Sequence, residues 1–586
     1  MTTWYVDSAA AGGGDGSAAT PWNALSSISW GSVSPADHII LTGEFREVLQ
    51  IQASGSAGAP IVIVFSSGAS LRPVAELTSW TLVSGEVYKK ALTDGALSYL
   101  WEDDVSLNPE SHYLDTEATI AAALDRGDWT VKNSPATCYL RCSDGADPST
   151  HTILVNDRLN DAYPGAIDTN GQSNVIIYEP RVHGVYWNSA TSAPIAISAG
   201  TNVAVLGGCL WDSRFGVYIQ GGTNIIISGT TIHDTVNSAI PVDASVSDLN
   251  NLIIEFCRIY NVSHQPRYNS VDLQFNQDGD GIGIGHLGGT IVGLTIRDNY
   301  ISNCGPVYAL DADIPANVAD TNGQPPNVDR GACVYLGTSY ALDVQDVTVE
   351  RNIFADGHRH GCFLGNEVLG TVRVVGNVFL RTGNAPEYGD QALMVSGTEN
   401  AAATFEVYNN TLVDNVQRTS ITLAGFDSVD TLGSGNNAFQ DNDKSADAAA
   451  LSWRGDVWRT SFTTPAADVE VSNAHDTRGD LQSAVLYREA TVDYTDLSNY
   501  QTTLSRGAGS INAVPNLRSD GRPNPGSPCI GAGTKWWSAG YTPRGIDGKR
   551  FANPPSIGAY EVRRSASSVP IRTTDLTSDV MKSRTL

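Results

Sequence analysis

The sequence predicts an all-β protein built as a solenoid, and three observations predict this class. A short apolar strand and a turn recur from residue 175 onward, and no 10–15-residue helical pattern separates the copies. A copy of this size has room for about three short strands and cannot bury its own apolar face, so it must stack on its neighbours. The recurring strands begin at Val175, Val203, Ile225, Leu252, Leu294, Val347, Val372, Phe405 and Leu432.

Two further positions repeat with these strands. An apolar residue follows seven positions after each start, at Val182, Leu210, Ile232, Ile259, Ile301, Phe354, Phe379, Leu412 and Phe439. Five consecutive copies carry asparagine at the fifth position, at Asn299, Asn352, Asn377, Asn410 and Asn437. Asparagine tolerates a left-handed backbone conformation, and stacked amides can hydrogen-bond from one turn to the next. We therefore expect an asparagine column in that conformation at one turn.

The regions outside the repeat suggest the domain organisation. Thr20 and Pro21 are good N-cap and first-turn residues for a short helix, Pro21 to Ile28, which would plug the end of the coil. Mixed polar sequence with scattered tryptophans interrupts the repeat after the first coils. The expected parts are an N-terminal cap (1–30), first coils (31–75), an inserted side module (76–155), a main coil with groove-forming loops (156–445), C-terminal coils and closure (446–562) and a tail (563–586). The tail is expected to be disordered or to serve as a docking segment.

Several motifs carry a family resemblance. They are Trp4-Tyr5-Val6-Asp7 with Gly14-Asp15-Gly16, Gly58-Ala59-Pro60-Ile61, Asp144-Gly145 with Asp147-Pro148-Ser149, and Ile546-Asp547-Gly548 with Ile557-Gly558-Ala559-Tyr560-Glu561. Together with the strand–asparagine repeat they resemble the right-handed parallel β-helix, or pectate-lyase-like, superfamily. The resemblance implies a right-handed parallel β-helix with an N-terminal capping helix and an inserted side module. It also implies a tailspike-type, polysaccharide-processing protein.

Composition excludes several other classes. The chain has 586 residues and a formal net charge of −27, from 36 basic and 63 acidic residues, which argues against nucleic acid or an anionic membrane as partner. No apolar run is long enough to span a membrane, and the N-terminus shows no signal peptide. Eight cysteines in so long a chain do not make a disulfide scaffold, and no zinc-ligand or nucleotide-binding spacing is present. We therefore expect no bound metal or cofactor, with calcium as the one exception considered below.

Long insertions all occur after the seventh-position residue. Leu252 to Leu294 spans 42 positions and Leu294 to Val347 spans 53, and the extra residues are 261–279 and 305–330, with a shorter stretch at 383–391. Loops on one edge of successive coils would wall a groove. Aligning the strands after these loops on their final glycine places Asp278, Arg330, His358 and Asp390 in one column. Asp280 and His360 share a second column, which Gln391 would join if the last strand slipped by one residue.

This density of acidic and basic groups favours acid–base chemistry on a glycan. Glycosidic hydrolysis needs one protonated and one ionised carboxyl group, and Asp278 and Asp280 are the leading pair, roughly 6–7 Å apart at their Cα atoms. The candidate catalytic residues are Asp278, Asp280, Arg330, His358, His360, Glu387 and Asp390. The candidate substrate-binding residues are Asp311, Asp313, Tyr335, Arg359 and Tyr388. An ordinary turn or packing role is the competing interpretation for each residue alone.

Two alternatives remain open. A polysaccharide lyase needs a base and a cation at a uronate, and Arg330, His358, Arg359 and Tyr388 would serve, but no lysine occurs between Lys132 and Lys444. Calcium held by an acidic groove would relieve the repulsion between this chain and an acidic glycan. The run Gly-Asp-Gly-Ile-Gly-Ile-Gly at 279–285 distantly resembles a motif of polygalacturonase-type hydrolases, but Asp280 stands where that family has histidine, so no role is transferred. The other alternative is a non-catalytic carbohydrate-binding adhesin.

An acidic coil without a visible signal peptide fits a phage tailspike or tail fibre, which similar coils often are. The resemblance implies a homotrimer on the virion tail, or an extracellular protein, that meets a surface polysaccharide and contacts tail or baseplate proteins. Aromatic residues would stack on sugar rings in the enzyme and in the adhesin alike.

Overall fold

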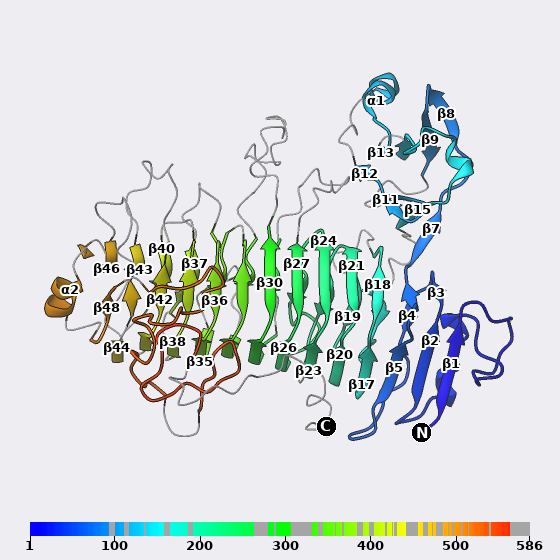
Figure 1. The fold of residues 1–586 in the computed structure, drawn as a ribbon. Coiled ribbons are helices and arrows are strands. Elements are labelled where there is room, and N and C mark those ends of the chain that lie inside the picture. The colour runs from blue at the N-terminus through cyan, green and yellow to red at the C-terminus, as the bar shows by residue number, and fades with distance from the viewer. Residues whose placement is uncertain are drawn as a thin grey trace.

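The computed structural model describes residues 1–562 except 93–99, 110–115, 134–135, 157–163, 186–191, 263–278, 286–288, 306–330, 338–343, 358, 366–367, 384–390, 398–402, 416–418, 425, 427–429, 441–454, 461–466, 472, 476–484, 490–491, 495–496, 505–507, 514 and 538–540. The described chain winds through three long sheets, which we call A, B and C, and these run the length of the molecule (Figure 1). Each coil contributes one strand to A, then to B, then to C, and successive coils pair in parallel. Parallel crossovers of this kind are right-handed, so the fold is a right-handed parallel β-helix, as the sequence predicts.

The strands have the following bounds. Sheet A contains β1 (Thr3–Asp7), β2 (His38–Thr42), β5 (Ile61–Phe65), β17 (Val175–Tyr178), β20 (Thr201–Leu206), β23 (Gly222–Ser228), β26 (Leu249–Glu255), β29 (Ile291–Arg297), β32 (Val344–Glu350), β35 (Val368–Val375), β38 (Ala403–Tyr408), β41 (Thr431–Gly435) and β44 (Ala467–Val471). Sheet B contains β3 (Glu44–Phe45), β6 (Ser70–Leu71), β18 (Arg181–His183), β21 (Cys209–Ser213), β24 (Thr231–Thr235), β27 (Arg258–Val262), β30 (Tyr300–Cys304), β33 (Ile353–Ala355), β36 (Val378–Leu380), β39 (Thr411–Val413), β42 (Ala438–Gln440), β45 (Ala474–His475) and β48 (Ile511–Asn512). Sheet C contains β4 (Leu49–Gln50), β16 (Gly165–Asp168), β19 (Ala193–Ile197), β22 (Val217–Ile219), β25 (Ile240–Val242), β28 (Ile282–Ile284), β31 (Val334–Leu336), β34 (Cys362–Leu364), β37 (Gln391–Ser396), β40 (Thr419–Ala424), β43 (Gly455–Thr460), β46 (Val485–Glu489) and the antiparallel β47 (Val492–Tyr494).

The core lies inside the coil and follows the predicted repeat. The nine strand-start residues from Val175 to Leu432 pair in one column of sheet A. The nine seventh-position residues from Val182 to Phe439 pair in one column of sheet B. All eighteen are at most 1% exposed. The repeat therefore sets the register of both sheets, because each copy can bury its apolar residues only against the copies above and below.

The asparagine column is confirmed at the turn between sheets A and B. Each side-chain amide donates to the carbonyl oxygen of the next, from Asn299 to Asn352 at 3.0 Å and onward to Asn473, which extends the column by one residue. The expected left-handed conformation is wrong for these asparagines. The residue before each one adopts it instead, as at Asp298 (φ 57°) and Arg351 (φ 55°). The preceding residue makes the sharp bend, which leaves the asparagine side chain directed inward to bond along the stack.

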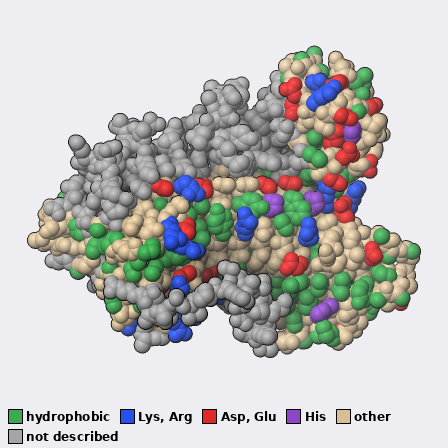
Figure 2. Space-filling model, in the orientation of Figure 1, with side chains coloured by type: hydrophobic (Ala, Val, Ile, Leu, Met, Phe, Trp, Pro, Cys, Tyr) green, Lys and Arg blue, Asp and Glu red, His purple; other side chains and the backbone are tan. Residues whose placement is uncertain are grey.

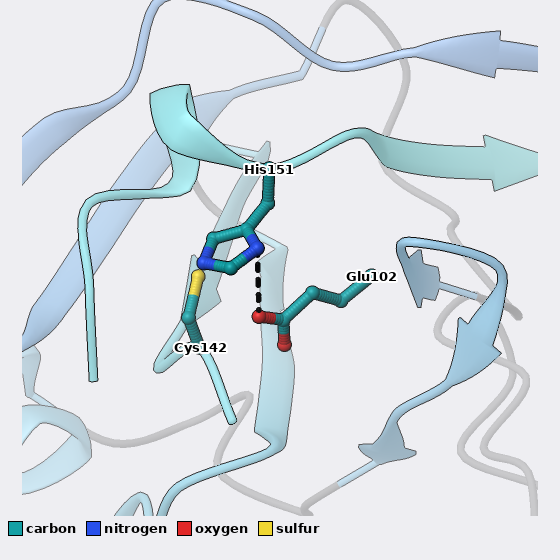
Figure 3. A group of neighbouring side chains, drawn as sticks. All are labelled: Glu102, Cys142 and His151. Atoms are coloured by element: carbon teal, nitrogen blue, oxygen red, sulfur yellow. Dashed lines mark ion pairs between the residues drawn. The ribbon is translucent and has the colours of Figure 1, made fainter. Parts of the chain in front are cut away.

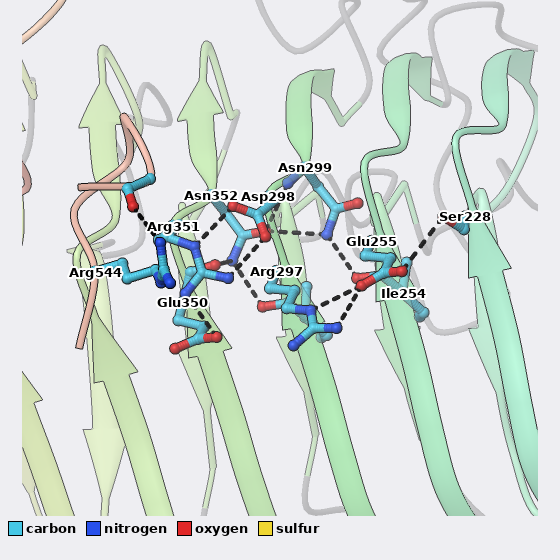
Figure 4. A network of polar contacts seen from close by, with 12 residues as sticks. Ser228, Ile254, Glu255, Arg297, Asp298, Asn299, Glu350, Arg351, Asn352 and Arg544 are labelled. Atoms are coloured by element: carbon cyan, nitrogen blue, oxygen red, sulfur yellow. Dashed lines mark hydrogen bonds and ion pairs between the residues drawn. The ribbon is translucent and has the colours of Figure 1, made fainter. Parts of the chain in front are cut away.

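Ion pairs beside this column link successive coils (Figure 4). Arg297 contacts Glu255 of the preceding coil at 2.6 Å, and Arg351 contacts Asp298 and Glu350, each at 2.7 Å. Burial alone would lower the pKa of Arg351, but the two carboxylates outweigh burial and raise that pKa. The charges at this turn are therefore paired from coil to coil.

The N-terminal end is capped without the predicted α-helix. Two 3-10 turns, η1 (Leu25–Ser27) and η2 (Trp30–Ser32), lie where a helix from Pro21 to Ile28 was expected. The helix cannot start at Pro21 because Trp22 is tied to β1, with its N–H donating to the Tyr5 carbonyl at 3.0 Å. Thr20 also bonds to Asp15 rather than capping a helix. Trp22, with Leu25 and Ile28, is nevertheless buried in the main core.

The chain between the first coils and β16 forms two small sheets beside the coil (Figure 1). We call residues 74–156 the side module. Its elements are β7 (Val74–Glu76), β8 (Thr81–Ser84), β9 (Val87–Ala91), β10 (Leu100–Glu102), β11 (Val105–Ser106), β12 (Asn108–Pro109), α1 (Glu117–Ala123), β13 (Asp128–Asn133), β14 (Ala136–Leu140), η3 (Pro148–Thr150) and β15 (Ile153–Asn156). It has small apolar clusters of its own, apart from the core of the coil.

The other end of the coil carries the helix α2 (Leu497–Leu504), whose Tyr500 is fully buried in the main core. Beyond it, the C-terminal segment folds back along sheets A and B, where Trp536 stacks on Tyr408 at 4.2 Å and the Asn409 amide donates to the Ser556 carbonyl. None of the described helices is long and apolar enough to cross a membrane. All eight cysteines are free thiols, as expected. The predictions for the tail, 563–586, lie outside the described residues.

Candidate active site on sheet C

The outer face of sheet C carries the predicted second column. Ile282 pairs with Val334, and Val334 pairs with Cys362, so Asp280, Ala332 and His360 occupy equivalent places before their strands. Asp280 and His360 therefore share a column, as predicted, with Ala332 between them. At about 4.8 Å per strand, their Cα atoms lie roughly 10 Å apart.

The alignment of the last strand on its final glycine is wrong by one residue. Cys362 pairs with Leu393, so Gln391 joins the column of Asp280 and His360. The slip puts Leu393 and Val395 inside the core, where each is fully buried. Burial of apolar residues therefore decides the register, as the alternative pairing anticipated.

Asp280 is buried and hydrogen-bonded to the next coil. It is 4% exposed, and its Oδ1 accepts a hydrogen bond from the Ala332 N–H at 2.9 Å. A Cβ added to Gly283 would lie 3.0 Å from Ser238 Oγ and 3.5 Å from Asp280 Oδ2. The hydroxyl and the carboxylate thus converge over Gly283 on the outer face of β28, at a position where glycine adds no side chain of its own.

Aromatic residues continue this outer face on the neighbouring coils. Tyr335 is in register with Gly283, and its ring stacks on Phe363 at 4.9 Å with an interplanar angle of 16°. Gly283 has no side chain, so it does not cover the face of the Tyr335 ring that points away from Phe363. A sugar-binding subsite combines polar groups that orient the sugar with an apolar surface that stacks on it, and the carboxylate, the hydroxyl and the aromatic ring are groups of these kinds.

His360 lies in a different environment from Asp280. It is 2% exposed, and its Nδ1 lies 3.1 Å from the Gln391 carbonyl oxygen. Burial, with help from the charge of Arg359, lowers the pKa of His360 to about 3. The imidazole is therefore neutral at physiological pH and does not carry the proton of a general acid there. Arg359 itself is half-buried, and its N–H donates to the Gly331 carbonyl at 3.1 Å.

Most other predicted site residues lie outside the described part of the chain. They are Asp278, Asp311, Asp313, Arg330, His358, Glu387, Tyr388 and Asp390. The same holds for nearly all of the three loops expected to wall the groove. Their predicted roles stay predictions.

A polar cluster earlier on sheet C was not predicted. The Tyr218 hydroxyl donates to Asp243, and Ser245 donates to the same carboxylate through its N–H at 2.9 Å and its Oγ at 2.6 Å. Burial and the charge of Asp243 raise the pKa of Tyr218. One coil further back, Ser198 donates to Asp168, and burial raises the pKa of that carboxyl group. Asp243 lies roughly 16 Å along the strand direction from Asp280, too far to act on the same bond.

The sequence does contain a signal for this cluster. Asp243 follows the inward residue Val242 as Gly285 follows Ile284, so it occupies the final-glycine position of a coil without a long insertion. Burial of the carboxylates could not have been recognised from the sequence in any case.

Comparison with known proteins finds the same architecture and no closer relationship. No family model matches the chain, and no curated protein matches it. Similar solved structures include XylC in complex with xylose (11% identity, 88% of this chain and 87% of that one, TM-score 0.49) and the pectate lyase Pel9A (14% identity, 96% of each chain, TM-score 0.41). A third is an alginate lyase from Paenibacillus sp. str. FPU-7 (12% identity, 84% and 99%, TM-score 0.31). These likenesses are distant and lie in the fold alone.

Proposed function

We propose that this protein binds a polysaccharide along the outer face of sheet C and depolymerises it by glycosidic hydrolysis. The observation that carries the proposal is the buried carboxylate of Asp280, held by the Ala332 N–H and converging with Ser238 over Gly283. A carboxyl group fixed beside a hydroxyl and near an aromatic ring suits proton transfer to or from a bound sugar. The stacked coils also offer an extended face that matches an extended glycan chain.

Hydrolysis requires a second carboxyl group, and we propose Asp278 for that role. It stands two positions before Asp280 in the sequence. Separations of about 5 Å favour retention of configuration at the sugar, and 6.5–9.5 Å favour inversion. Elimination at a uronate is the competing reaction. It is less favoured because this strongly acidic chain repels an acidic glycan unless calcium is bound.

The biological setting belongs to the same proposal. We propose an extracellular or virion-tail protein, of the tailspike or tail-fibre kind, that assembles as a homotrimer and contacts tail or baseplate proteins. The acidic chain and the solenoid fold are compatible with this setting. An adhesin that binds the glycan without cleaving it is the non-enzymatic outcome of the test below.

The test incubates the protein with purified capsular, O-antigen and extracellular polysaccharides and follows chain length by size-exclusion chromatography and mass spectrometry. Asp280→Asn keeps the shape of the side chain and removes its acid–base function, so we expect activity to fall about 10²- to 10⁴-fold with glycan binding retained. Asp243→Asn is the matched control on the same face, and it should keep most of the activity. Products with the near-235 nm absorbance of an unsaturated uronate would replace hydrolysis with elimination. Binding without cleavage of any glycan would establish the adhesin.

A further inference from the structure

The side module brings together three side chains of the types that bind transition metals (Figure 3). Glu102 ends β10, Cys142 follows β14 and His151 follows η3. One ligand atom from each lies within 4.8 Å of the other two. Glu102 and Cys142 are buried and His151 is half-buried, so the group is set into the module rather than spread on its surface. Figure 2 shows acidic side chains gathered on the exposed part of this module.

The carboxylate of Glu102 is only half satisfied. Its Oε2 accepts a hydrogen bond from the Ser143 N–H at 2.8 Å. Its Oε1 has no hydrogen-bond partner among the described residues, although Glu102 is only 3% exposed. His151 Nδ1 lies 3.4 Å from Oε1 but is closer to Asp103 Oδ2, at 2.8 Å. Oε1 thus has only this longer ion pair with His151 and no hydrogen bond, which is costly for a buried carboxylate oxygen and points to a cation shared with His151.

The other two side chains match that cation. The Cys142 thiol is fully buried, and its Sγ lies within 4.8 Å of a ligand atom of Glu102 and of His151. Asp144 Oδ1 lies 3.3 Å from His151 Nε2, so a further oxygen lies at the rim of the group.

The donor set indicates which metal would bind. Sulfur, imidazole nitrogen and carboxylate oxygen together are ligands of zinc, whereas calcium and magnesium prefer oxygen alone. In a tetrahedral zinc site these atoms would be separated by about 3.3–3.6 Å, given bond lengths of about 2.0–2.3 Å. Glu102 Oε1 and His151 Nδ1 already lie 3.4 Å apart, and no pair of ligand atoms needs to approach by more than roughly 1 to 1.5 Å. We propose that Glu102, Cys142 and His151 bind one Zn²⁺ ion, with Asp144 or water as fourth ligand.

The site would fasten segments that are distant in the sequence. It joins the β10–β11 hairpin, the turn after β14 and the η3 turn before β15, which belong to or flank the two small sheets of the module. A module with small apolar clusters has little core of its own, so a metal ion that cross-links its segments would stabilise it. The spacing of 40 residues from Glu102 to Cys142 and nine from Cys142 to His151 matches no zinc motif, so the sequence alone predicted no metal.

The test uses the full-length protein, stripped with a chelator and then given zinc or cobalt. We expect one equivalent of zinc by elemental analysis after desalting, and a thiolate-to-metal charge-transfer band with cobalt. Cys142→Ala should abolish both. Cys138→Ala is the matched control, because Cys138 is also a buried thiol of the module but lies outside the group. Zinc should raise the unfolding temperature of the wild type and of the control, and leave that of Cys142→Ala unchanged.

Two results would overturn the proposal. One is a wild-type protein that retains no zinc and shows no charge-transfer band. The other is a Cys142→Ala protein that still retains one equivalent. If Cys142→Ala fails to fold, His151→Gln replaces it, since it keeps the thiol and removes the nitrogen ligand. Retention of zinc with an unchanged cobalt spectrum in His151→Gln would then count against the site.

Discussion

Asn377→Ala tests how the asparagine column holds the coils together. Asn377 is fully buried. Its Oδ1 accepts from the Asn352 N–H at 2.9 Å and from the Asn352 amide at 3.0 Å. Its Nδ2 donates to the Val349 carbonyl at 2.9 Å and to Asn410 Oδ1 at 3.1 Å. Alanine removes all four bonds at once, in a place where water cannot replace them.

The magnitude follows from what is left behind. The Asn352 N–H loses its partner at the turn, and an orphaned buried donor costs about 1–3 kcal/mol. The remaining three bonds add a smaller loss, because their other partners keep some of their contacts. We expect Asn377→Ala to lower the free energy of unfolding by about 2–5 kcal/mol.

Asn224→Gly is the control. Asn224 lies in a similar but exposed amide chain, where its Nδ2 donates to Asn202 at 2.9 Å. Its φ of 55° suits glycine, so the backbone is not strained by the change. Water replaces the exposed bonds, and the expected loss is below about 1 kcal/mol.

The assay is guanidinium unfolding followed by far-ultraviolet circular dichroism, with hydrogen exchange of the 350–380 peptide as the local measurement. The local measurement matters because a long repeat array need not unfold in one step. We expect faster exchange around Asn352 in Asn377→Ala only. Equal destabilisation by Asn377→Ala and Asn224→Gly would refute the view that burial gives the column its strength.

Three further predictions concern titratable groups. The pKa of His360 is about 3 in the folded chain and near 6.5 in the unfolded chain, so its contribution to stability is complete above pH 6.5 and is lost as pH falls toward 3. In urea titrations, His360→Gln should therefore reduce the loss of unfolding free energy between pH 7.5 and pH 4.5 by about 2–3 kcal/mol. The same pH dependence of stability in His360→Gln and the wild type would contradict this. For His233, burial opposes protonation, but Asp234 and Cys209 raise the pKa to about 9, so its contribution is complete below pH 6.5 and is lost as pH rises through 9. His233→Gln should therefore flatten the alkaline limb of the stability profile, and the same limb in the variant would count against it. Cys209 is the one cysteine of eight that is not buried, so iodoacetamide should label it first in the native protein, and peptide mapping that finds a buried cysteine labelled equally fast would contradict the burial pattern.

The periodic part of this protein was predictable because a solenoid repeats one physical requirement. Each copy must bury the same positions against its neighbours, so the columns from Val175 and from Val182 follow from the sequence alone. The structure of the first residues was harder to predict. Thr20 and Pro21 locally favour the start of a helix, but the pairing of Trp22 with β1 overrides that preference. The groups Asp168, Asp243 and Glu102–Cys142–His151 were missed for another reason. Their burial and their contacts between segments are not visible in the sequence, although Asp243 does occupy the final-glycine position of its coil.

The glycines around β28 serve two different purposes: Gly281 is needed for packing inside the coil, and Gly283 belongs to the candidate site. A Cβ on Gly281 would lie 2.5 Å from Ile301 Cγ2 and 2.6 Å from the Cys333 carbonyl oxygen, both inside the coil. Gly281 is thus required by packing, and Gly281→Ala should destabilise the protein by about 1–3 kcal/mol. A Cβ on Gly283 would meet mainly the Ser238 hydroxyl, on the outer face. Gly283→Ala should therefore leave the unfolding midpoint nearly unchanged and weaken glycan binding and cleavage, because the added methyl group would displace the Ser238 hydroxyl beside Asp280. Loss of stability in Gly283→Ala, or full activity in a stable Gly283→Ala protein, would show that the site does not depend on glycine at this position.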